Sequence, residues 1–231
     1  MGFFTQKNKP TQNTYAVVTG AGSGIGRSFA MELAKRGGTI VCADINLNAA
    51  EETVQLIQAE TAGQAFAVQC DVGIKEQVYE LSEQAEKLMG HPVTLLINNA
   101  GVGLGGKFDE VSLEDWQWCM HVNLWGVIHG CHYFVPKFKK QGYGAIINVA
   151  SAAGYTAAPE MTAYNVTKSS VLALSETLSA ELRSANIRVN VLCPTLVPTN
   201  IMKNGRLPSR YSGLADQLLM NHAFVTSDQV A

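Results

Sequence analysis

The sequence of 231 residues contains no CxxC pair, no excess of basic over acidic residues and no apolar run long enough to cross a membrane. Lys and Arg number 17 against 19 Asp and Glu, so the formal net charge of -2 provides no general attraction to nucleic acid or to anionic membranes. Five cysteines, odd in number and mostly within apolar segments, indicate buried free thiols in a reducing compartment. We therefore expect a cytoplasmic protein with no nucleic-acid or membrane partner.

The composition is that of one large globular domain, because 47% of the residues are hydrophobic and only 16% are charged. Residues 1–13 are polar and lack the apolar core of a secretory signal, so we expect a mobile N-terminal tail. No internal repeat or low-complexity tract divides the remainder. The sequence thus predicts a single domain over residues 14–231.

Short apolar runs alternate with longer stretches of helical periodicity, which is the pattern of βαβ units in an α/β fold. We expect strands at residues 15–19, 39–43, 65–70, 93–97, 145–149 and 187–193. We expect helices over residues 24–36, 47–61, 75–89, 113–140 and 162–185. Pro136 falls in the last turns of the fourth helix, where it predicts a kink or an end.

A glycine-rich segment, Thr19-Gly-Ala-Gly-Ser-Gly-Ile-Gly26, separates the first expected strand from the first helix. Glycines there permit a tight turn and let a pyrophosphate approach the free amides at the helix start. The alternative is a tight turn with no ligand. Asp44 ends the second strand, where a carboxylate can bind both hydroxyls of an adenosine ribose and repel the extra phosphate of NADP. The alternative for Asp44 is that it only caps the following helix.

Tyr164 and Lys168 are four residues apart in the last long helix and therefore share one face. A nearby ammonium lowers the pKa of a phenol, which makes tyrosine a usable acid and base near neutral pH. Ser151 follows the fifth strand at the carboxyl edge of the sheet, where its hydroxyl could bind the reacting oxygen. The alternatives are a solvated helix face for the pair and a structural role for the serine.

Together these residues resemble the short-chain dehydrogenase/reductase family, from Thr14 to at least Thr199. The matching motifs are Thr19-Gly20-x-x-x-Gly24-x-Gly26, Asp71-Val72, Asn98-Asn-Ala-Gly101, Asn123, Ser151, Tyr164 and Lys168. The resemblance implies a Rossmann-like doubly wound parallel sheet of strand order 3-2-1-4-5-6. It also implies hydride transfer between NAD and an alcohol or ketone of a small substrate.

By this resemblance, Tyr164 is the general acid and base, Ser151 orients the oxygen, and Lys168 also holds the nicotinamide ribose. Asn123 resembles the family residue that holds a water in a proton relay through Lys168. Residues expected to bind the cofactor are Gly20, Ser23, Gly24, Ile25, Gly26, Asp44, Asp71, Val72, Asn99, Ala100, Gly101, Tyr164, Lys168, Pro194, Val197 and Thr199. Ser23 and Ile45 stand where NADP-preferring relatives often carry a basic residue, so NAD is favoured over NADP.

The sequence departs from the family pattern at two places. Thr195 follows Pro194 where relatives usually have glycine, and the sequence stops where relatives continue into a seventh strand. We expect a substrate lid over about 195–225, whose apolar residues favour an apolar substrate or, equally, simple coverage of the core. Val102 to Gly106, Tyr155 and Met161 are expected to border the pocket.

The remaining features concern assembly and rival functions. Apolar residues on several sides of the two long helices favour a homodimer or homotetramer built on them. His121, Trp125, His129 and His132 recur at helical spacing without a carboxylate cluster, so we expect no metal site. The rival functions are a catalytically silent NAD(P)-binding sensor or scaffold and a sugar-nucleotide epimerase or dehydratase. The latter normally carries a larger substrate domain than this sequence allows.

Overall fold

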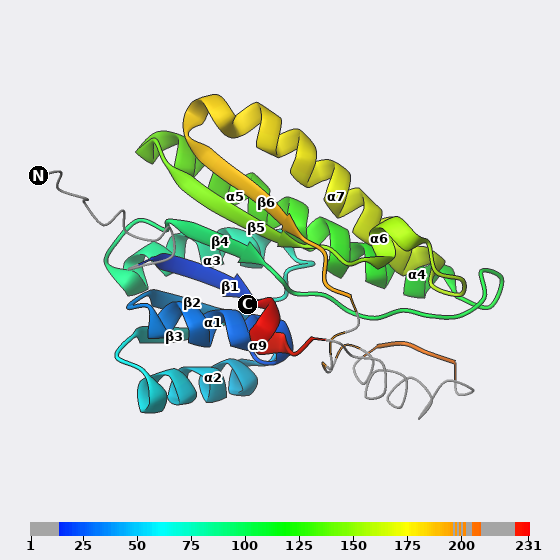
Figure 1. Cartoon of the computed structure of the whole chain (residues 1–231), viewed down its shortest axis with the longest axis horizontal. Coiled ribbons are helices and arrows are strands. Elements are labelled where there is room, and N and C mark those ends of the chain that lie inside the picture. The colour runs from blue at the N-terminus through cyan, green and yellow to red at the C-terminus, as the bar shows by residue number, and fades with distance from the viewer. Residues whose placement is uncertain (1–13, 196, 198, 200, 202–204, 209–224) are drawn as a thin grey trace, which may run out of the picture.

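The computed structural model describes residues 14–195, 197, 199, 201, 205–208 and 225–231. Within these residues the core is a six-stranded parallel sheet of order β3-β2-β1-β4-β5-β6, which confirms the predicted order (Figure 1). The strands are β1 (Tyr15–Thr19), β2 (Thr39–Asp44), β3 (Gln64–Gln69), β4 (Leu95–Asn98), β5 (Gly144–Val149) and β6 (Ile187–Leu192). The order reverses between β1 and β4, and this switch point opens a crevice at the carboxyl ends of the strands.

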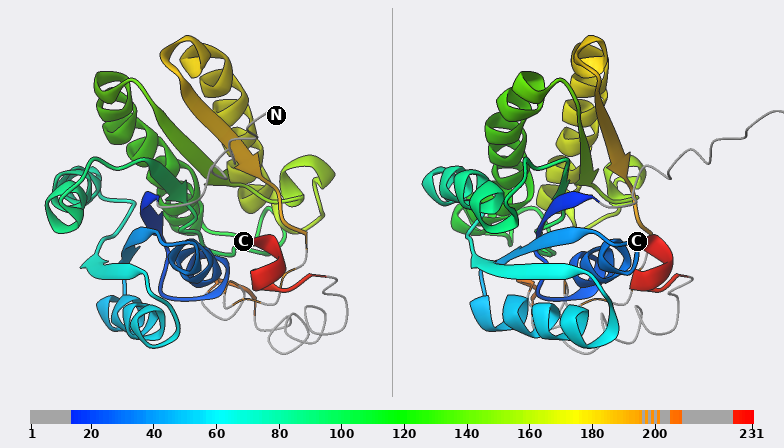
Figure 2. Two further views of the ribbon diagram at one scale, coloured as in Figure 1. Left: turned by 60° about the vertical axis from the view of Figure 1, so that its left-hand side comes forward. Right: turned by 90° about the vertical axis from the view of Figure 1, so that its left-hand side faces the viewer.

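Helices cover both faces of the sheet. On one face lie α1 (Gly24–Lys35) and α2 (Leu47–Glu60), with α9 (Ser227–Val230) packed beside α1. On the other face lie α3 (Lys75–Met89), α5 (Gly126–Gln141) and α7 (Thr162–Leu182) (Figure 2). Alternate residues of each strand face opposite layers: Val17 packs toward α3 and α5, whereas Ala16 and Val18 pack toward α1 and α2. Burial on both faces explains why the strands are continuous apolar runs rather than alternating ones.

The long helix expected over residues 113–140 is present as three consecutive pieces. These are α4 (Leu113–Met120), a π-helical turn η1 (His121–Trp125) and α5. Pro136 lies inside α5 and does not end it; the helix ends at Gly142, which has a left-handed φ of 80°. The π-helical turn was not predicted, and it contains the buried Asn123.

The other element bounds agree with the sequence prediction to within about two residues, the usual uncertainty at helix and strand ends. α7 ends at Leu182 and continues as a short 3-10 turn, η2 (Arg183–Ala185). A four-residue helix, α6 (Ala153–Thr156), which was not predicted, lies between β5 and α7.

The C-terminal residues 225–231 are held against the first βα unit. Thr226 and Gln229 form a capping box at the start of α9, and the Ser28 hydroxyl of α1 donates to Asp228 at 2.7 Å. β6 is one of the two edge strands of the sheet in the described residues, and β3 is the other. The predicted N-terminal tail and most of the predicted lid fall outside those residues. No helix in the described ranges has both the length and the apolar character needed to span a membrane.

Candidate active site

A cleft of about 1040 Å³ opens along the carboxyl edge of the sheet. Its walls come from the segments that follow all six strands, because the carboxyl ends of parallel strands meet at one edge. Sixteen of the predicted site residues line it: Gly20, Ser23, Gly24, Ile25, Asp44, Asp71, Val72, Asn99, Ala100, Gly101, Ser151, Tyr164, Lys168, Pro194, Val197 and Thr199. Gly26 and Asn123 lie behind the wall and do not line the cleft.

The glycine-rich turn between β1 and α1 brings bare backbone to the cleft. Gly20 and Gly24 have φ values of 65° and 52°, which side chains disfavour. A Cβ atom on Gly26 would lie 2.1 Å from the Gly20 carbonyl oxygen, so this glycine is required for packing. Ser23 precedes α1 but its side chain makes no capping hydrogen bond, and the first turn of α1 has no acidic residue. The positive end of α1 is therefore available to an anion such as a pyrophosphate.

Asp44 stands at the end of β2 with its carboxylate in the cleft wall. One oxygen accepts from the Gly22 amide at 2.8 Å and the other from the Asn46 amide at 3.0 Å. The N-cap of α2 is Asn46, whose side chain accepts from Ala49, so Asp44 does not cap that helix. A carboxylate accepts about four hydrogen bonds, which leaves acceptor capacity for a diol in the cleft.

Thr19 and Asn99 join the glycine turn to the end of β4. The Asn99 side-chain amide donates to the carbonyl oxygens of Thr19 at 2.9 Å and Gly20 at 3.3 Å. The Thr19 hydroxyl in turn accepts from the backbone amides of Asn99 and Ala100. Thr19 entered the sequence prediction only as part of the glycine pattern, and its hydrogen bonds to the β4 loop were not foreseen. These hydrogen bonds of Thr19 and Asn99 fix the distance between the ends of β1 and β4, where the strand order reverses.

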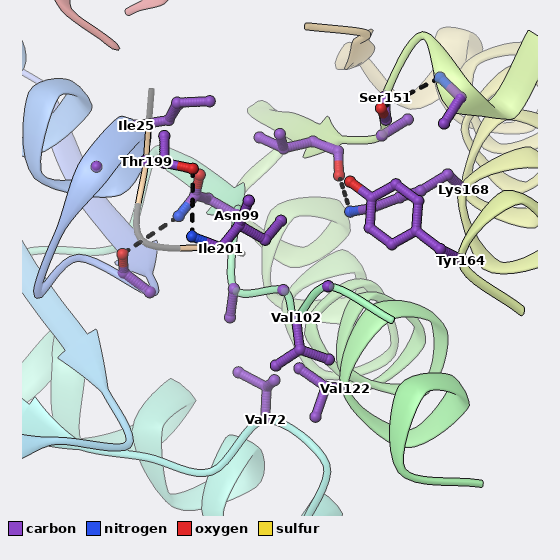
Figure 3. Close-up of a pocket in the computed structure, with 18 of the residues that line it drawn as sticks. Ile25, Val72, Asn99, Val102, Val122, Ser151, Tyr164, Lys168, Thr199 and Ile201 are labelled. Carbon is purple, nitrogen blue, oxygen red and sulfur yellow. Dashed lines mark hydrogen bonds between the residues drawn. The ribbon is translucent and has the colours of Figure 1, made fainter. Parts of the chain in front are cut away.

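Tyr164, Lys168 and Ser151 meet at the end of the cleft nearest β5, as Figure 3 shows. Tyr164 and Lys168 come from the first turns of α7 and are 8% and 3% exposed. The Ser151 hydroxyl accepts from the Ala153 amide at 3.2 Å and lies close enough to the Tyr164 phenol to lower its pKa slightly. The Lys168 ammonium donates to the Val149 carbonyl at 2.9 Å and lies 5.6 Å from the centre of the Tyr164 ring. The three groups predicted to converge therefore do so.

Burial controls the protonation of this pair. Desolvation raises the pKa of Tyr164 above its ordinary value, against the smaller lowering effect of the Ser151 hydroxyl. Desolvation also lowers the pKa of Lys168 to about 8. The expectation that the ammonium lowers the phenol pKa is thus not met in the protein by itself, because Lys168 bonds to Val149 and the phenol is deeply buried. A further positive charge in the cleft is needed to favour the phenolate.

Asn123 acts on the backbone of the β4 loop. Its side-chain oxygen accepts from the Val102 amide at 2.8 Å and its nitrogen donates to the Val102 carbonyl at 2.9 Å. A side chain on Gly101 would lie 3.2 Å from the Asn123 oxygen and 3.5 Å from the Lys168 nitrogen, so these two groups flank Gly101. The π-helical turn is what places this buried amide against the loop. The predicted role of Asn123 in holding a relay water stays a prediction.

The same end of the cleft, nearest β5, is also lined by α4 and by the connection from β5 to α7. Val102, Gly103 and Met161 line it as predicted. Leu104, Gly105 and Gly106 do not, and neither does Tyr155, which is 67% exposed. Sequence reasoning missed Gln117 and Trp118 of α4. The signal available for Trp118 was its position on the helix little more than one turn before Asn123. The Arg206 guanidinium stacks 4.1 Å from the centre of the Trp118 ring and pairs with Asp115.

Two of the helically spaced histidines have backbone carbonyl partners. His129 bonds to the Val72 carbonyl at 2.9 Å and His121 to the Gln117 carbonyl at 2.8 Å. In the described residues no group of three or more His, Cys, Asp or Glu side chains is placed to hold a metal ion.

Comparisons with known proteins agree with this geometry. The 7alpha-hydroxysteroid dehydrogenase of Escherichia coli is 32% identical over 201 residues, which cover 87% of this chain and 78% of that protein. The probable oxidoreductase EphD of Mycobacterium tuberculosis is 36% identical over 191 residues, 82% of this chain, but this chain spans only 32% of EphD.

Among solved structures, a short chain dehydrogenase/reductase from Burkholderia phymatum in complex with NAD superposes with a TM-score of 0.88 at 36% identity. The match covers 96% of this chain and 84% of that one. The model of the short chain dehydrogenase family matches residues 14–208, which contain the sheet and all the residues that line the cleft. The chain therefore belongs to the short-chain dehydrogenase family.

Proposed function

We propose that this protein is an NAD-dependent oxidoreductase that interconverts an alcohol and a ketone on a small, apolar substrate. The observation that carries the proposal is the meeting of the Tyr164 phenol, the Ser151 hydroxyl and the Lys168 ammonium in the cleft that also contains the glycine turn. The NAD bound to the Burkholderia phymatum relative supports this assignment of the cleft.

The residues present fit a dinucleotide. The uncapped start of α1, with Gly20 and Gly24, would hold the pyrophosphate, and Asp44 would hold the adenosine ribose. Asp71 and Val72 would lie beside the adenine, and Lys168 would bind the nicotinamide ribose.

NAD is favoured over NADP by the charges around Asp44. The Asp44 carboxylate would repel a phosphate on the ribose, and the neighbouring Ile45 is 63% exposed and uncharged. Arg27 is the nearby cation, but its guanidinium bonds to Gly22, Thr53 and Glu52. It is therefore already engaged and does not offer a free charge to that phosphate.

Bound NAD supplies the hydride acceptor for alcohol oxidation and, when reduced, the hydride donor for the reverse reaction. In oxidation, Tyr164 takes the hydroxyl proton of the substrate as general base; in reduction it returns a proton to the carbonyl oxygen. The Ser151 hydroxyl holds that oxygen in place. Lys168 bonds to Val149 and does not by itself offset the desolvation of Tyr164, so the phenolate would be favoured only when bound NAD adds its positive charge to the cleft. Asn123 fixes the Val102 loop that faces them.

The substrate end favours apolar molecules because Val102, Trp118, Ala158 and Met161 line it. Arg206 is paired with Asp115 there, so it does not provide a free cation for an anionic substrate. We also propose that the protein forms a homodimer or homotetramer through its long helices, since Trp125 and Val166 are 46% and 41% exposed. Light scattering of the purified protein measures that state.

Substitution of Tyr164 tests the proposal. The protein, NAD and a panel of secondary alcohols are mixed, and the absorbance of reduced nicotinamide is followed. We expect Tyr164→Phe to lower kcat about a thousandfold while NAD binding, measured by titration, is retained. Tyr143→Phe, immediately before β5 and so at the edge of the sheet opposite to the cleft, is the matched control and keeps full activity.

Two outcomes contradict the proposal. Full turnover by Tyr164→Phe on an accepted substrate rules out the acid and base role. Tight NAD binding without turnover of any alcohol or ketone would instead identify a silent cofactor-binding module.

A further inference from the structure

The connection between β5 and α7, residues 151–161, forms one wall of the substrate end of the cleft. Residues along its whole length line that end: Ser151, Ala152, Ala153, Thr156, Ala158 and Met161. Ser151 begins this connection and Tyr164 follows it on α7. The shape of the connection therefore determines how a substrate reaches both groups.

The backbone of this wall is strained. Ala157 has φ 48° and Glu160 has φ 60°, in the left-handed region that side chains with a Cβ atom disfavour. Neither residue is a glycine, and Pro159 between them restricts the chain further. Such conformations persist only where surrounding contacts over-determine them.

Two side chains of α7 supply contacts of this kind. The Asn165 amide donates to the Ala158 carbonyl at 2.7 Å, and the Ser169 hydroxyl donates to the Gly154 carbonyl at 2.6 Å. Asn165 and Ser169 are one helical turn apart, each directly after Tyr164 and Lys168 respectively. One face of α7 thus presents Tyr164 and Lys168 to the cleft while the adjoining face holds the wall.

The hydrogen bond of Asn165 to Ala158 is expected to contribute more than that of Ser169 to Gly154. Asn165 as a residue is 9% exposed and its bond to Ala158 is partly buried, whereas Ser169 is exposed. A buried hydrogen bond lost on one side leaves its partner unsatisfied, which is more damaging than the loss of a solvated one. The Asn165 bond also meets the wall at Ala158, between the two strained residues. On the far side of the wall, the Gly106 amide donates to the Glu160 carbonyl at 2.7 Å.

We propose that Asn165 is a positioning residue that holds the strained wall 157–161 at a fixed distance from Tyr164 and so sets which substrates fit. Ser169 is a second, weaker tether. This inference rests on the proposed function, because it takes the cleft as the substrate site. Without Asn165, the wall relaxes away from its left-handed conformations, and substrates large enough to touch Ala158 and Met161 lose their fit.

Steady-state kinetics with a large and a small secondary alcohol, cyclohexanol and propan-2-ol, test the inference. We expect Asn165→Ala to raise KM for cyclohexanol roughly fivefold, the equivalent of one buried hydrogen bond, while KM for propan-2-ol and for NAD changes less than about twofold. The matched control is Ser170→Ala, because the Ser170 hydroxyl bonds to Val166 within its own helix and does not touch the wall. Equal losses on both alcohols would indicate general destabilisation and overturn the proposal.

A rescue variant separates positioning from simple loss of packing. Ala157→Gly removes the penalty for a positive φ at the cost of one methyl group. We therefore expect Asn165→Ala combined with Ala157→Gly to recover at least half of the lost selectivity for cyclohexanol. A double variant no better than Asn165→Ala argues against strain as the cause.

Hydrogen-deuterium exchange distinguishes failure of this inference from failure of the proposed function. In Asn165→Ala, amide exchange should accelerate at least about tenfold in peptides that contain Gly106 or residues 155–162, and stay unchanged in the glycine turn. Faster exchange in a protein that oxidises no alcohol would support the tether but refute the proposed reaction. Unchanged exchange in an active enzyme would refute the tether alone.

Discussion

Replacement of Lys168 by methionine should make the protein without cofactor more stable at neutral pH and leave it without activity. Lys168 is 3% exposed, and burial lowers its pKa from 10.5 to about 8. Because the folded-state pKa lies below the unfolded-state value, the unfolded chain holds this proton more tightly. The cost of burying the charge is therefore present in full below pH 8 and disappears as the pH rises toward 10.5.

The magnitude follows from these two values. A pKa of about 8 against 10.5 corresponds to about 3 kcal/mol at pH 7, which falls to about 1 kcal/mol at pH 10. Methionine has a similar length and no charge, but it leaves the Val149 carbonyl without the lysine donor, at a cost of about 1–2 kcal/mol. We therefore expect Lys168→Met to raise the free energy of unfolding by about 1–2 kcal/mol at pH 7 and to give no gain at pH 10.

Urea unfolding of the protein without cofactor, followed by tryptophan fluorescence at both pH values, measures this difference. Lys140→Met, at an exposed position in α5, is the control and should change the free energy of unfolding by less than about 0.5 kcal/mol at either pH. A Lys168→Met variant less stable than the unsubstituted protein at pH 7 would refute the reasoning, because it would mean that the buried ammonium is favourably solvated by its surroundings.

Two further predictions concern the cofactor and the core. Asp44→Ser should weaken NAD binding at least about tenfold and bring the affinity for NADP close to that for NAD, because it removes both the diol acceptor and the repelling charge. Fluorescence titration with each nucleotide checks this, and an unchanged preference for NAD would contradict it. Asn148→Ala should lower the free energy of unfolding by about 2–4 kcal/mol, because the buried Asn98 amide (2.8 Å) and the Ser175 hydroxyl (3.0 Å) both lose their Asn148 partner. A loss below about 0.5 kcal/mol in urea unfolding would show that this hydrogen-bond network contributes little to stability.

Most of the sheet could be predicted from sequence because its signal is local. Runs such as Tyr15–Thr19 and Thr39–Asp44 are apolar throughout, as strands buried on both faces must be. The π-helical turn His121–Trp125 could not be predicted, because the local sequence is compatible with an uninterrupted α-helix. At this turn the Asn123 side chain makes a tertiary contact with the Val102 backbone, which the local sequence does not reveal.

The residues of the candidate site also differ in whether local sequence or tertiary structure determines their place. The residues on the nucleotide side follow directly from strand ends and glycines, and Asp44, Gly20 and Gly24 lie where the sequence placed them. Trp118 was missed because the only signal for it is its position little more than one turn before Asn123, and the pattern of α4 alone does not show which face meets the cleft. The protonation of Tyr164 was misjudged because the cost of desolvation depends on how deeply the folded protein buries the phenol.

The two halves of the cleft also differ in what their geometry depends on. The nucleotide half is shaped by backbone amides, by glycines with positive φ and by short hydrogen bonds between neighbouring strand ends, such as those of Thr19 and Asn99. The substrate half depends on side-chain contacts to a segment in which Ala157 and Glu160 are held in left-handed conformations, above all the bond from Asn165 to Ala158 between them. A contact that opposes strain can be lost without unfolding the sheet, because the strained segment lies outside the strands. Substitutions in residues 157–161 should therefore change which alcohol is accepted before they change the binding of NAD, whereas substitutions at Gly20 or Gly26 cannot separate cofactor binding from the packing of β1, α1 and β4.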